Sequence, residues 1–371
     1  MGASIRLGRV LGIPLGINYS WFIIFALVTF SLLYQFRLLY PAWSLPERWA
    51  VAVVTSLLFF GSVLAHELSH SVVAISRGIP VKGITLFVFG GAAQIGREAQ
   101  TPGVELLIAV VGPFSSIVLG GAFWGLYLLL RPVSDHLAGI ALVLAPINVA
   151  LGVFNMIPGF PLDGGRVFRA VLWKVTRNYR RSTGIAIFAG QMVAALFILG
   201  GILIAVRSGS LQGLWLALIG WFLGSAAGAT RRQAQLTEAL QGSTARDLMA
   251  PDFPAVRSDA SLTELVASSL LVPGRRFFLV VQDGRFQGVI TLRMLRRVPQ
   301  AQWPFTSVAS AMLPRDQVRY VAPKEEALAV LEILEEAGLH QLPVIDEDMP
   351  VGLVTREGLL RRLRVRSELR I

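Results

Sequence analysis

The chain has 371 residues, of which 54% are hydrophobic and only 15% are charged. Soluble domains carry about 25% charged residues, so much of this chain is expected to lie in a lipid bilayer. The net charge of +11 does not point to nucleic acid as a partner, because the basic residues form short groups at the ends of apolar segments, which is typical of membrane proteins.

Six segments are long and apolar enough to cross a bilayer, which takes about 20 mostly apolar residues. The residues before the first segment lack the apolar core and cleavage site of a signal peptide and are expected to form a short amphipathic lead-in. Pro113 and Pro146 fall inside two of the segments, and packed membrane helices tolerate proline. The predicted spans are 19–36, 49–76, 104–130, 137–157, 185–206 and 211–229.

The Lys and Arg residues of the connecting loops predict how the chain is oriented, because short loops rich in them stay in the cytoplasm. The loop after the fourth span holds Arg166, Arg169, Lys174, Arg177, Arg180 and Arg181. Loops on the opposite side hold fewer basic residues, namely Arg37, Arg48, Arg131 and Arg207. The expected protein is therefore a multi-pass protein of the cell membrane with both termini in the cytoplasm.

The second span contains the sequence His-Glu-Leu-Ser-His at residues 66–70. Residues i and i+4 share one helix face, so His66 and His70 can present their imidazole nitrogens to one metal ion. Glu67 is offset around the helix, so it can reach a metal-bound water without binding the metal. An ionisable residue within a membrane span costs about 2.5–3.5 kcal/mol on insertion scales, which favours a functional role for all three.

A tetrahedral zinc bound by two histidines needs a third protein ligand, and the chain has no cysteine to supply it. The best candidate is Asp163, in the segment Asn-Met-Ile-Pro-Gly-Phe-Pro-Leu-Asp-Gly-Gly-Arg at residues 155–166. Its prolines and glycines exclude a continuous helix, and irregular backbone at membrane depth is tolerated where it lines a protein interior or a wet cavity. Asp163 is therefore predicted to turn toward the histidines. A capping role in an ordinary cytoplasmic loop is the alternative.

These motifs resemble those of the site-2 proteases, which are polytopic zinc metalloproteases that release membrane-tethered regulators. Residues 66–70 resemble the H-E-x-x-H motif of that family. Residues 154–166 resemble its F-N-x-x-P-x-x-P-x-D-G-G-R signature, and the resemblance extends over roughly residues 7–229.

The resemblance implies zinc-dependent intramembrane proteolysis of a membrane-tethered protein. It implies one zinc ion per chain, bound by His66, His70 and Asp163. Glu67 would act as the general base on a zinc-bound water, whose pKa falls to about 7, and the hydroxide would attack a peptide carbonyl. The resemblance also implies that Asn155 lies in the active site, as a polar donor to the substrate or to the oxyanion.

Two further elements fit the same family. Residues 83–94 are predicted to form short strands, where site-2 proteases have a small membrane-embedded sheet that is thought to pair with substrate. The implied substrate-binding residues are Phe89, Gly90 and Gly91, and a plain amphipathic hairpin on the membrane surface is the alternative. Residues 112–116 resemble the family's G-P-x-x-N element, and Ser116 replaces the usual Asn, which leaves close helix packing as the expected role.

After the last span the sequence contains two similar units of about 60 residues, each predicted as helix, strand, strand, helix. They resemble a tandem pair of cystathionine-β-synthase (CBS) domains, which often sense adenine nucleotides. The acid that usually contacts the ribose is missing, because Met294 and Gly358 stand three residues after Thr291 and Thr355. An adenine nucleotide is therefore one possible ligand. Homodimerisation, docking of substrate and a structural role are the alternatives.

The expected fold is a polytopic α-helical membrane protein with about six transmembrane helices and a small membrane-embedded β-sheet, followed by a cytoplasmic α/β domain. The expected domain limits are 1–235 for the protease and 243–371 for the CBS pair, with repeats at about 243–300 and 306–366. A CBS-regulated membrane transporter or channel with a structural metal site is the alternative. It predicts internal repeats among the spans, which the sequence lacks, and it gives Glu67 no role.

Overall fold

The computed structural model describes residues 4–209, 211–270 and 277–358. The chain divides into two compact units between Arg231 and Arg232. The first unit contains the predicted metal-binding residues, and the second contains the two predicted repeats. The predicted ends of the second repeat and of the C-terminal domain, at residues 366 and 371, lie outside the described residues.

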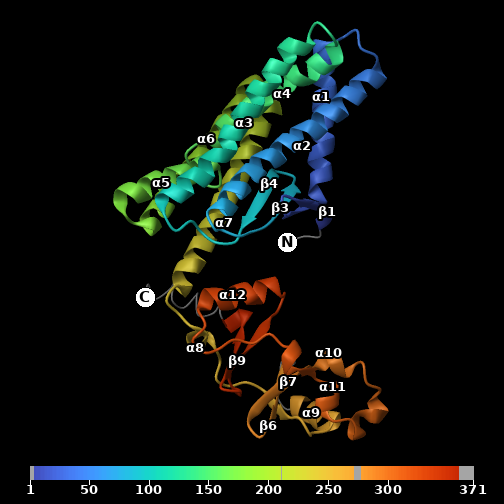
Figure 1. Ribbon diagram of the computed structural model, residues 1–371, viewed down its shortest axis with the longest axis vertical. Helices are drawn as coiled ribbons and strands as arrows, with labels where there is room; N and C mark the ends of the chain where they lie inside the picture. Colours follow the sequence, from blue (N-terminus) through green and yellow to red (C-terminus); the bar gives the residue numbers. More distant parts are fainter. Residues whose placement is uncertain (1–3, 210, 271–276, 359–371) are drawn as a thin grey trace. The chain divides into compact units, whose positions relative to one another are not determined.

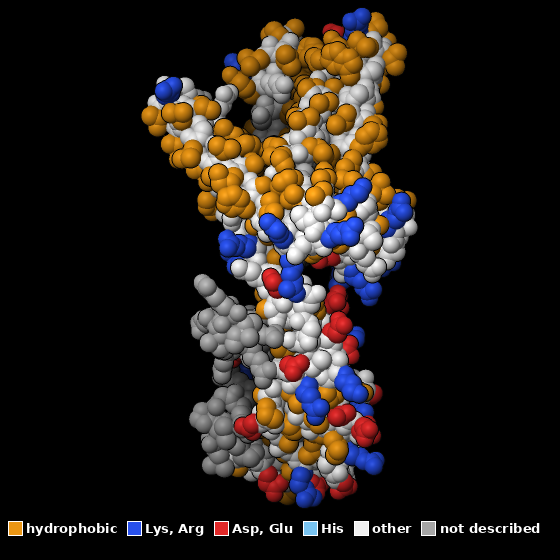
Figure 2. All heavy atoms as spheres, turned by 90° about the vertical axis from the view of Figure 1, so that its left-hand side faces the viewer, with side chains coloured by type: hydrophobic (Ala, Val, Ile, Leu, Met, Phe, Trp, Pro, Cys, Tyr) orange, Lys and Arg blue, Asp and Glu red, His pale blue; other side chains and the backbone are white. Residues whose placement is uncertain are grey.

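Within the described residues, six helices are long and apolar enough to cross a membrane, which confirms the six predicted spans (Figure 1). They are α1 (Ser20–Leu39), α2 (Leu45–Ser76), α3 (Pro102–Leu130), α4 (Asp135–Asn155), α6 (Tyr179–Ser208) and α7 (Leu211–Leu240). Figure 2 shows hydrophobic side chains over the flanks of this unit and Lys and Arg side chains gathered at one end of it. An apolar flank with basic residues gathered at one end is typical of a membrane-spanning unit.

Two helical regions differ from the predictions. The basic loop after the fourth span is mostly helix, because α5 (Asp163–Thr176) begins two residues after Pro161, the last proline of that segment. Its buried face holds two glycines, Arg169 and Ala170, while Lys174 is exposed. The last span also continues as helix through Leu240, because residues 230–240 contain neither glycine nor proline.

A four-stranded sheet lies beside α2, with the strand order β1-β2-β3-β4 (Figure 1). Its strands are β1 (Ser4–Val10), β2 (Ile13–Asn18), β3 (Val81–Phe87) and β4 (Gly90–Ile95). The prediction that the N-terminal residues form only a short amphipathic lead-in is wrong, because they form strands β1 and β2 of this sheet. Leu11 and Gly12 adopt positive φ values of 51° and 80°, which produces a tight turn and folds these residues into a hairpin. Strand β2 then pairs in parallel with β3.

The apolar face of this sheet packs on the helix that carries the predicted ligands. Ile13, Leu15 and Ile84 are buried and contact Leu64 and Leu68 of α2. Strand β4 forms one edge of the sheet, and β1 forms the other. The sheet is thus held against the part of α2 that contains His66, Glu67 and His70.

The second unit has the predicted alternation of helices and strands. Its sheets have the strand orders β5-β6-β7-β8 and β10-β9. The helices are α8 (Ala245–Leu248), α9 (Leu262–Leu270), α10 (Leu292–Leu295), α11 (Val308–Ala311) and α12 (Ala327–Glu336), with 3-10 helices at Gln300–Phe305 and Arg315–Gln317. The strands are β5 (Ala255–Arg257), β6 (Phe277–Gln282), β7 (Arg285–Thr291), β8 (Leu313–Pro314), β9 (Gln341–Asp346) and β10 (Met349–Thr355).

Candidate metal centre

Three side chains predicted to bind metal converge at one point of the first unit. The Nε2 atoms of His66 and His70 lie 3.2 Å apart, and each lies 3.1 Å from the Oδ2 atom of Asp163. Both histidines are buried on α2, and Asp163 is the first residue of α5. Within the described residues, this is the cluster of three His, Asp or Glu side chains whose ligand atoms are close enough to share an ion.

The outer ring nitrogens of both histidines contact α3. The Nδ1 atom of His70 lies 2.6 Å from the backbone oxygen of Ile108. A carbonyl oxygen only accepts, so Nδ1 carries the hydrogen and Nε2 of the neutral ring keeps its lone pair. The Nδ1 atom of His66 lies 2.9 Å from the hydroxyl oxygen of Ser116. Ser116 therefore contacts a predicted ligand, and its role goes beyond the helix packing expected from the sequence.

The donor atoms of this cluster fit a zinc ion. Burial alone would raise the pKa of the Asp163 carboxyl, but the His66 and His70 side chains beside it hold that pKa well below the usual range, so the carboxylate stays charged. A tetrahedral zinc with ligands at about 2.0–2.1 Å holds the ligand atoms roughly 3.3 Å apart, close to the spacings in this cluster. Two imidazole lone pairs and a carboxylate facing one point suit a borderline-soft cation.

Glycines allow Asp163 to reach the histidines. Helix α4 ends at Asn155, and the chain turns before α5 begins. A Cβ atom on Gly164 would overlap the backbone of Met156, and one on Gly165 would overlap the backbone of Gly159. Only residues without a side chain permit so close an approach. The glycine pair of the predicted signature thus packs the turn against the start of α5.

Gly112 of α3 has a similar role beside the histidines. A Cβ atom at this position would overlap the His70 ring and would lie 2.9 Å from the Nε2 atom of His66. From the sequence, Gly112 is expected to serve helix packing alone. Its place in an apolar helix gives no local signal that it faces the metal centre.

The predicted general base, Glu67, lies between the metal centre and the sheet. Its Oε2 atom accepts a hydrogen bond of 3.2 Å from the backbone N–H of Ala93 in β4. A Cβ atom on Gly91 would lie only 2.5 Å from the Cγ atom of Glu67. Strand β4 therefore runs directly along this carboxylate, and the predicted substrate-binding residue Gly91 lies beside it.

The other predicted site residues make their contacts outside the metal centre. Gly90, at the start of β4, has a φ of 123°, a backbone conformation that only glycine adopts without strain. Phe89 is 51% exposed, and its ring stacks on Phe222 of α7 with the ring centroids 3.5 Å apart. Asn155 is half-buried and donates to the backbone oxygen of Leu151 in its own helix. Among the described hydrogen bonds, none joins Asn155 to the metal centre.

One further feature of this region is not predicted from the sequence. Arg169 counts there only toward the orientation of the chain, but in the structure it is buried and paired with Glu105 of α3. A glutamate in the first turn of an apolar helix was the signal for this pair, and nothing local indicated its partner.

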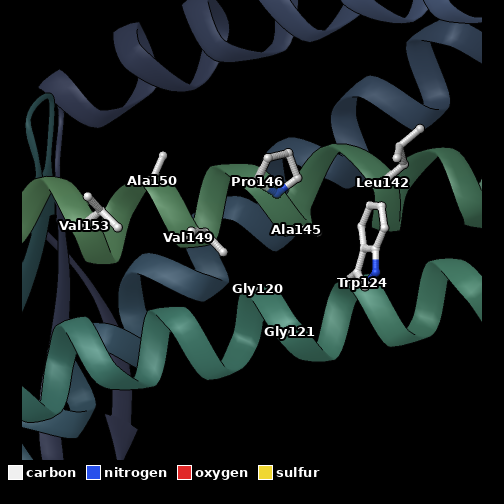
Figure 3. A pocket seen from close by; sticks show the side chains of 9 residues that line it. All are labelled: Gly120, Gly121, Trp124, Leu142, Ala145, Pro146, Val149, Ala150 and Val153. Atoms are coloured by element: carbon white, nitrogen blue, oxygen red, sulfur yellow. The ribbon is translucent and has the colours of Figure 1, made fainter.

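A groove between α3 and α4 lies apart from these residues (Figure 3). Its volume is about 620 Å³, and it is lined by Gly120, Gly121, Trp124, Leu142, Ala145, Pro146, Val149, Ala150 and Val153. None of these side chains binds metal through a carboxylate or imidazole, and none is a general base. Among the described residues, the imidazole and carboxylate groups close enough to share a metal ion lie instead in the cluster around Asp163.

Comparison with known proteins assigns this chain to a family. The model of peptidase family M50 matches residues 54–138 and 132–199, and that of the CBS domain matches residues 245–300 and 308–365. A Synechocystis protein, provisionally named as a zinc metalloprotease, is 36% identical over 98% of this chain and 96% of its own length. A zinc metalloprotease of Methanocaldococcus jannaschii is 27% identical over 98% of this chain and 97% of its own length.

Among solved structures, the site-2 protease of Methanocaldococcus jannaschii is 30% identical and covers 62% of this chain and 95% of its own, with a TM-score of 0.42. The near full-length similarity to the Synechocystis protein decides the assignment. This chain belongs to the M50 peptidase family of zinc metalloproteases, the site-2 protease family, and carries a tandem pair of CBS domains.

Proposed function

We propose that this metalloprotease is an intramembrane endopeptidase that binds one zinc ion per chain and cuts a membrane-tethered protein, such as a regulatory factor. The observation that carries the proposal is that Asp163 of α5 converges with His66 and His70 beside Glu67. The last three residues lie on α2, a helix long and apolar enough to span a membrane. Membership of the M50 family does not favour the alternative of a transporter with a structural metal.

The proposed roles follow from the contacts of each residue. His66, His70 and Asp163 would hold the zinc, with Ser116 and Ile108 orienting the two imidazoles. When bound, zinc supplies Lewis-acid chemistry, which lowers the pKa of water to about 7 and polarises a peptide carbonyl. Glu67 accepts the proton of the attacking water and passes it to the leaving amine. The Ala93 N–H keeps the Glu67 carboxylate pointed toward β4.

We propose that the substrate is held as an added strand on β4. A helical substrate hides its carbonyl groups in i→i−4 hydrogen bonds, so it must unwind before it is cut. Strand β4 is an edge strand of its sheet, and its Ala93 N–H donates to Glu67, so this edge faces the general base. A segment paired along Gly90 and Gly91 would be extended beside Glu67, with Phe89 at one end of the strand. Asn155 is proposed as a polar donor to the substrate.

The remaining assignments concern orientation and regulation. We propose that the protein lies in the cell membrane with both termini on the cytoplasmic side, as the basic loops indicate. Residues 243–371 are proposed as a regulatory domain that follows a protease domain of residues 1–235. The Thr355 hydroxyl accepts a hydrogen bond from the backbone N–H of Gly358, where a ribose-binding acid is usual. An adenine nucleotide would therefore bind weakly, through its phosphates, and a homodimer contact is the alternative role.

One set of purified variants tests the proposal. The unmodified protein is expected to contain about one zinc, and His66→Ala and His70→Ala are each expected to remove it. Glu67→Gln keeps the shape of the side chain but not the base, so zinc should remain while proteolysis falls roughly 10²–10⁴-fold. Stoichiometric zinc in the double histidine variant would contradict the site. Co-expression with the Glu67→Gln variant and identification of the trapped protein would name the substrate.

A further inference from the structure

A buried ion pair joins two of the helices around the metal centre. The Nε atom of Arg169 on α5 donates to the Oε1 atom of Glu105 on α3 at 2.6 Å, and the Nη2 atom donates to the same oxygen. Glu105 is 1% exposed and Arg169 is 9% exposed. Charged side chains this deeply buried are rare in proteins and require a partner.

The guanidinium of Arg169 is also held between two aromatic rings. Its central carbon lies 4.9 Å from the ring centroid of Phe160 and 4.8 Å from that of Tyr179. Phe160 belongs to the turn that leads into Asp163, and Tyr179 is the first residue of α6. One side chain thus contacts α3, the turn before α5, and α6.

Each partner of the pair is one or two helical turns from the metal centre. Glu105 precedes Ile108 by three residues on α3, and the Ile108 carbonyl oxygen accepts the hydrogen bond from His70. Arg169 follows Asp163 by six residues on α5. Both helices are rigid over such short distances, so a shift of α5 along α3 would move Asp163 relative to His70.

The ion pair between Glu105 and Arg169 is expected to add little to the stability of the fold. The second carboxylate oxygen of Glu105 has no hydrogen-bond partner among the described residues. A buried ion pair whose lone pairs are not all satisfied is often no more stabilising than apolar residues of the same size. Apolar side chains, however, would set no specific register between α5 and α3, whereas the two directional N–H···O bonds from Arg169 to Glu105 favour one register.

We propose that Glu105 and Arg169 are positioning residues that set the register of α5 against α3 and so hold Asp163 at its place beside the two histidines. The inference rests on the proposed zinc site, which it deepens. It assigns to the pair a role in metal affinity, although neither side chain touches the metal centre.

The test measures zinc affinity in the full-length protein by competition with a chelator, together with thermal unfolding. The double variant Glu105→Leu/Arg169→Met replaces the pair by apolar residues of similar size. It is expected to remain folded with a similar unfolding temperature and to bind zinc about 10–100-fold more weakly. Lys174→Met is the matched control, because Lys174 is an exposed cation on the same helix, and its zinc affinity should be unchanged.

The conservative variant Arg169→Lys keeps the charge but loses the two-pronged geometry, so it should also weaken zinc binding. It provides the test if the double variant fails to fold. Zinc affinity equal to that of Lys174→Met in a folded variant of the pair would overturn the proposal. His66→Ala measured alongside separates the two failures. If His66→Ala binds zinc normally, the proposed zinc site itself is wrong. If His66→Ala loses zinc while the variants of Glu105 and Arg169 bind it with normal affinity, only the positioning role is wrong.

Discussion

Gly112 of α3 lies against His70 of α2 so closely that any side chain at position 112 would overlap the imidazole ring. The proposed metal ligands therefore depend on the absence of a side chain in a neighbouring helix. Alanine favours a helix by about 1 kcal/mol over glycine, so Gly112→Ala should not unwind α3. The variant tests the position of the histidines with little change in the helix.

We expect Gly112→Ala to lower zinc affinity by about tenfold or more and to lower proteolysis in parallel. Gly121→Ala is the matched control, because a Cβ atom on Gly121, in the same helix, would meet no atom within 4 Å. Metal analysis after chelator competition and a cleavage assay would measure both effects. Full zinc binding by Gly112→Ala would show that the histidines do not occupy the observed positions.

Ser116 should tune the affinity of the metal centre through His66. Ser116→Ala removes the hydroxyl that lies 2.9 Å from the Nδ1 atom of His66, so zinc affinity should fall about 10–100-fold. Ser116→Asn restores a polar partner and should keep most of the affinity. Ser115→Ala serves as the control, because the Ser115 hydroxyl donates to the Gly112 backbone oxygen within its own helix. Equal affinities in all three variants would remove Ser116 from the site.

Gly91 should govern catalysis without affecting the metal. A methyl group at this position would lie 2.5 Å from the Cγ atom of Glu67 and would displace the carboxylate. We expect Gly91→Ala to keep its zinc and to lose about 10²-fold in cleavage rate, because small misplacements of a catalytic group have effects of this size. Ala92→Val is the control, since neighbouring strand residues point to opposite faces. Unimpaired cleavage by Gly91→Ala would contradict the role of Glu67.

The orientation of the chain is open to a labelling test, because the natural sequence contains no cysteine. Arg180→Cys, at the start of α6, should react with a membrane-impermeant reagent only when the cytoplasmic side is accessible. Arg131→Cys, at the end of α3, should react only from the opposite side. The reverse pattern would overturn the proposed topology.

The CBS pair should control the cleavage of the substrate rather than the binding of the metal. The proposed ligands and their hydrogen-bond partners all precede residue 232, so deleting residues 243–371 should leave zinc bound but change the cleavage rate of the natural substrate. Unchanged cleavage would remove the regulatory role. Titration of ATP and AMP into the full-length protein tests the ligand. Absence of binding at millimolar concentration would leave docking or dimerisation as the better account.

The sequence by itself determined those features that depend on local pattern. Apolar segments of sufficient length predict the six spans, because the bilayer sets a minimum length for a helix. His66 and His70 share a helix face through their spacing alone. The alternation of helices and strands after the last span likewise predicts two α/β repeats, and their resemblance to CBS domains agrees with the family match.

Only the tertiary structure decided how distant segments meet. Asp163 reaches His66 across 97 positions, and His70 reaches Ile108 across 38. The parallel pairing of β2 with β3, the contact of Gly112 with the histidines and the burial of Arg169 against Glu105 have the same character. Helical period and hydropathy describe which face of a segment is buried, but not which segment covers it. That choice is made by the packing of whole helices and sheets, so it became visible only in the folded chain.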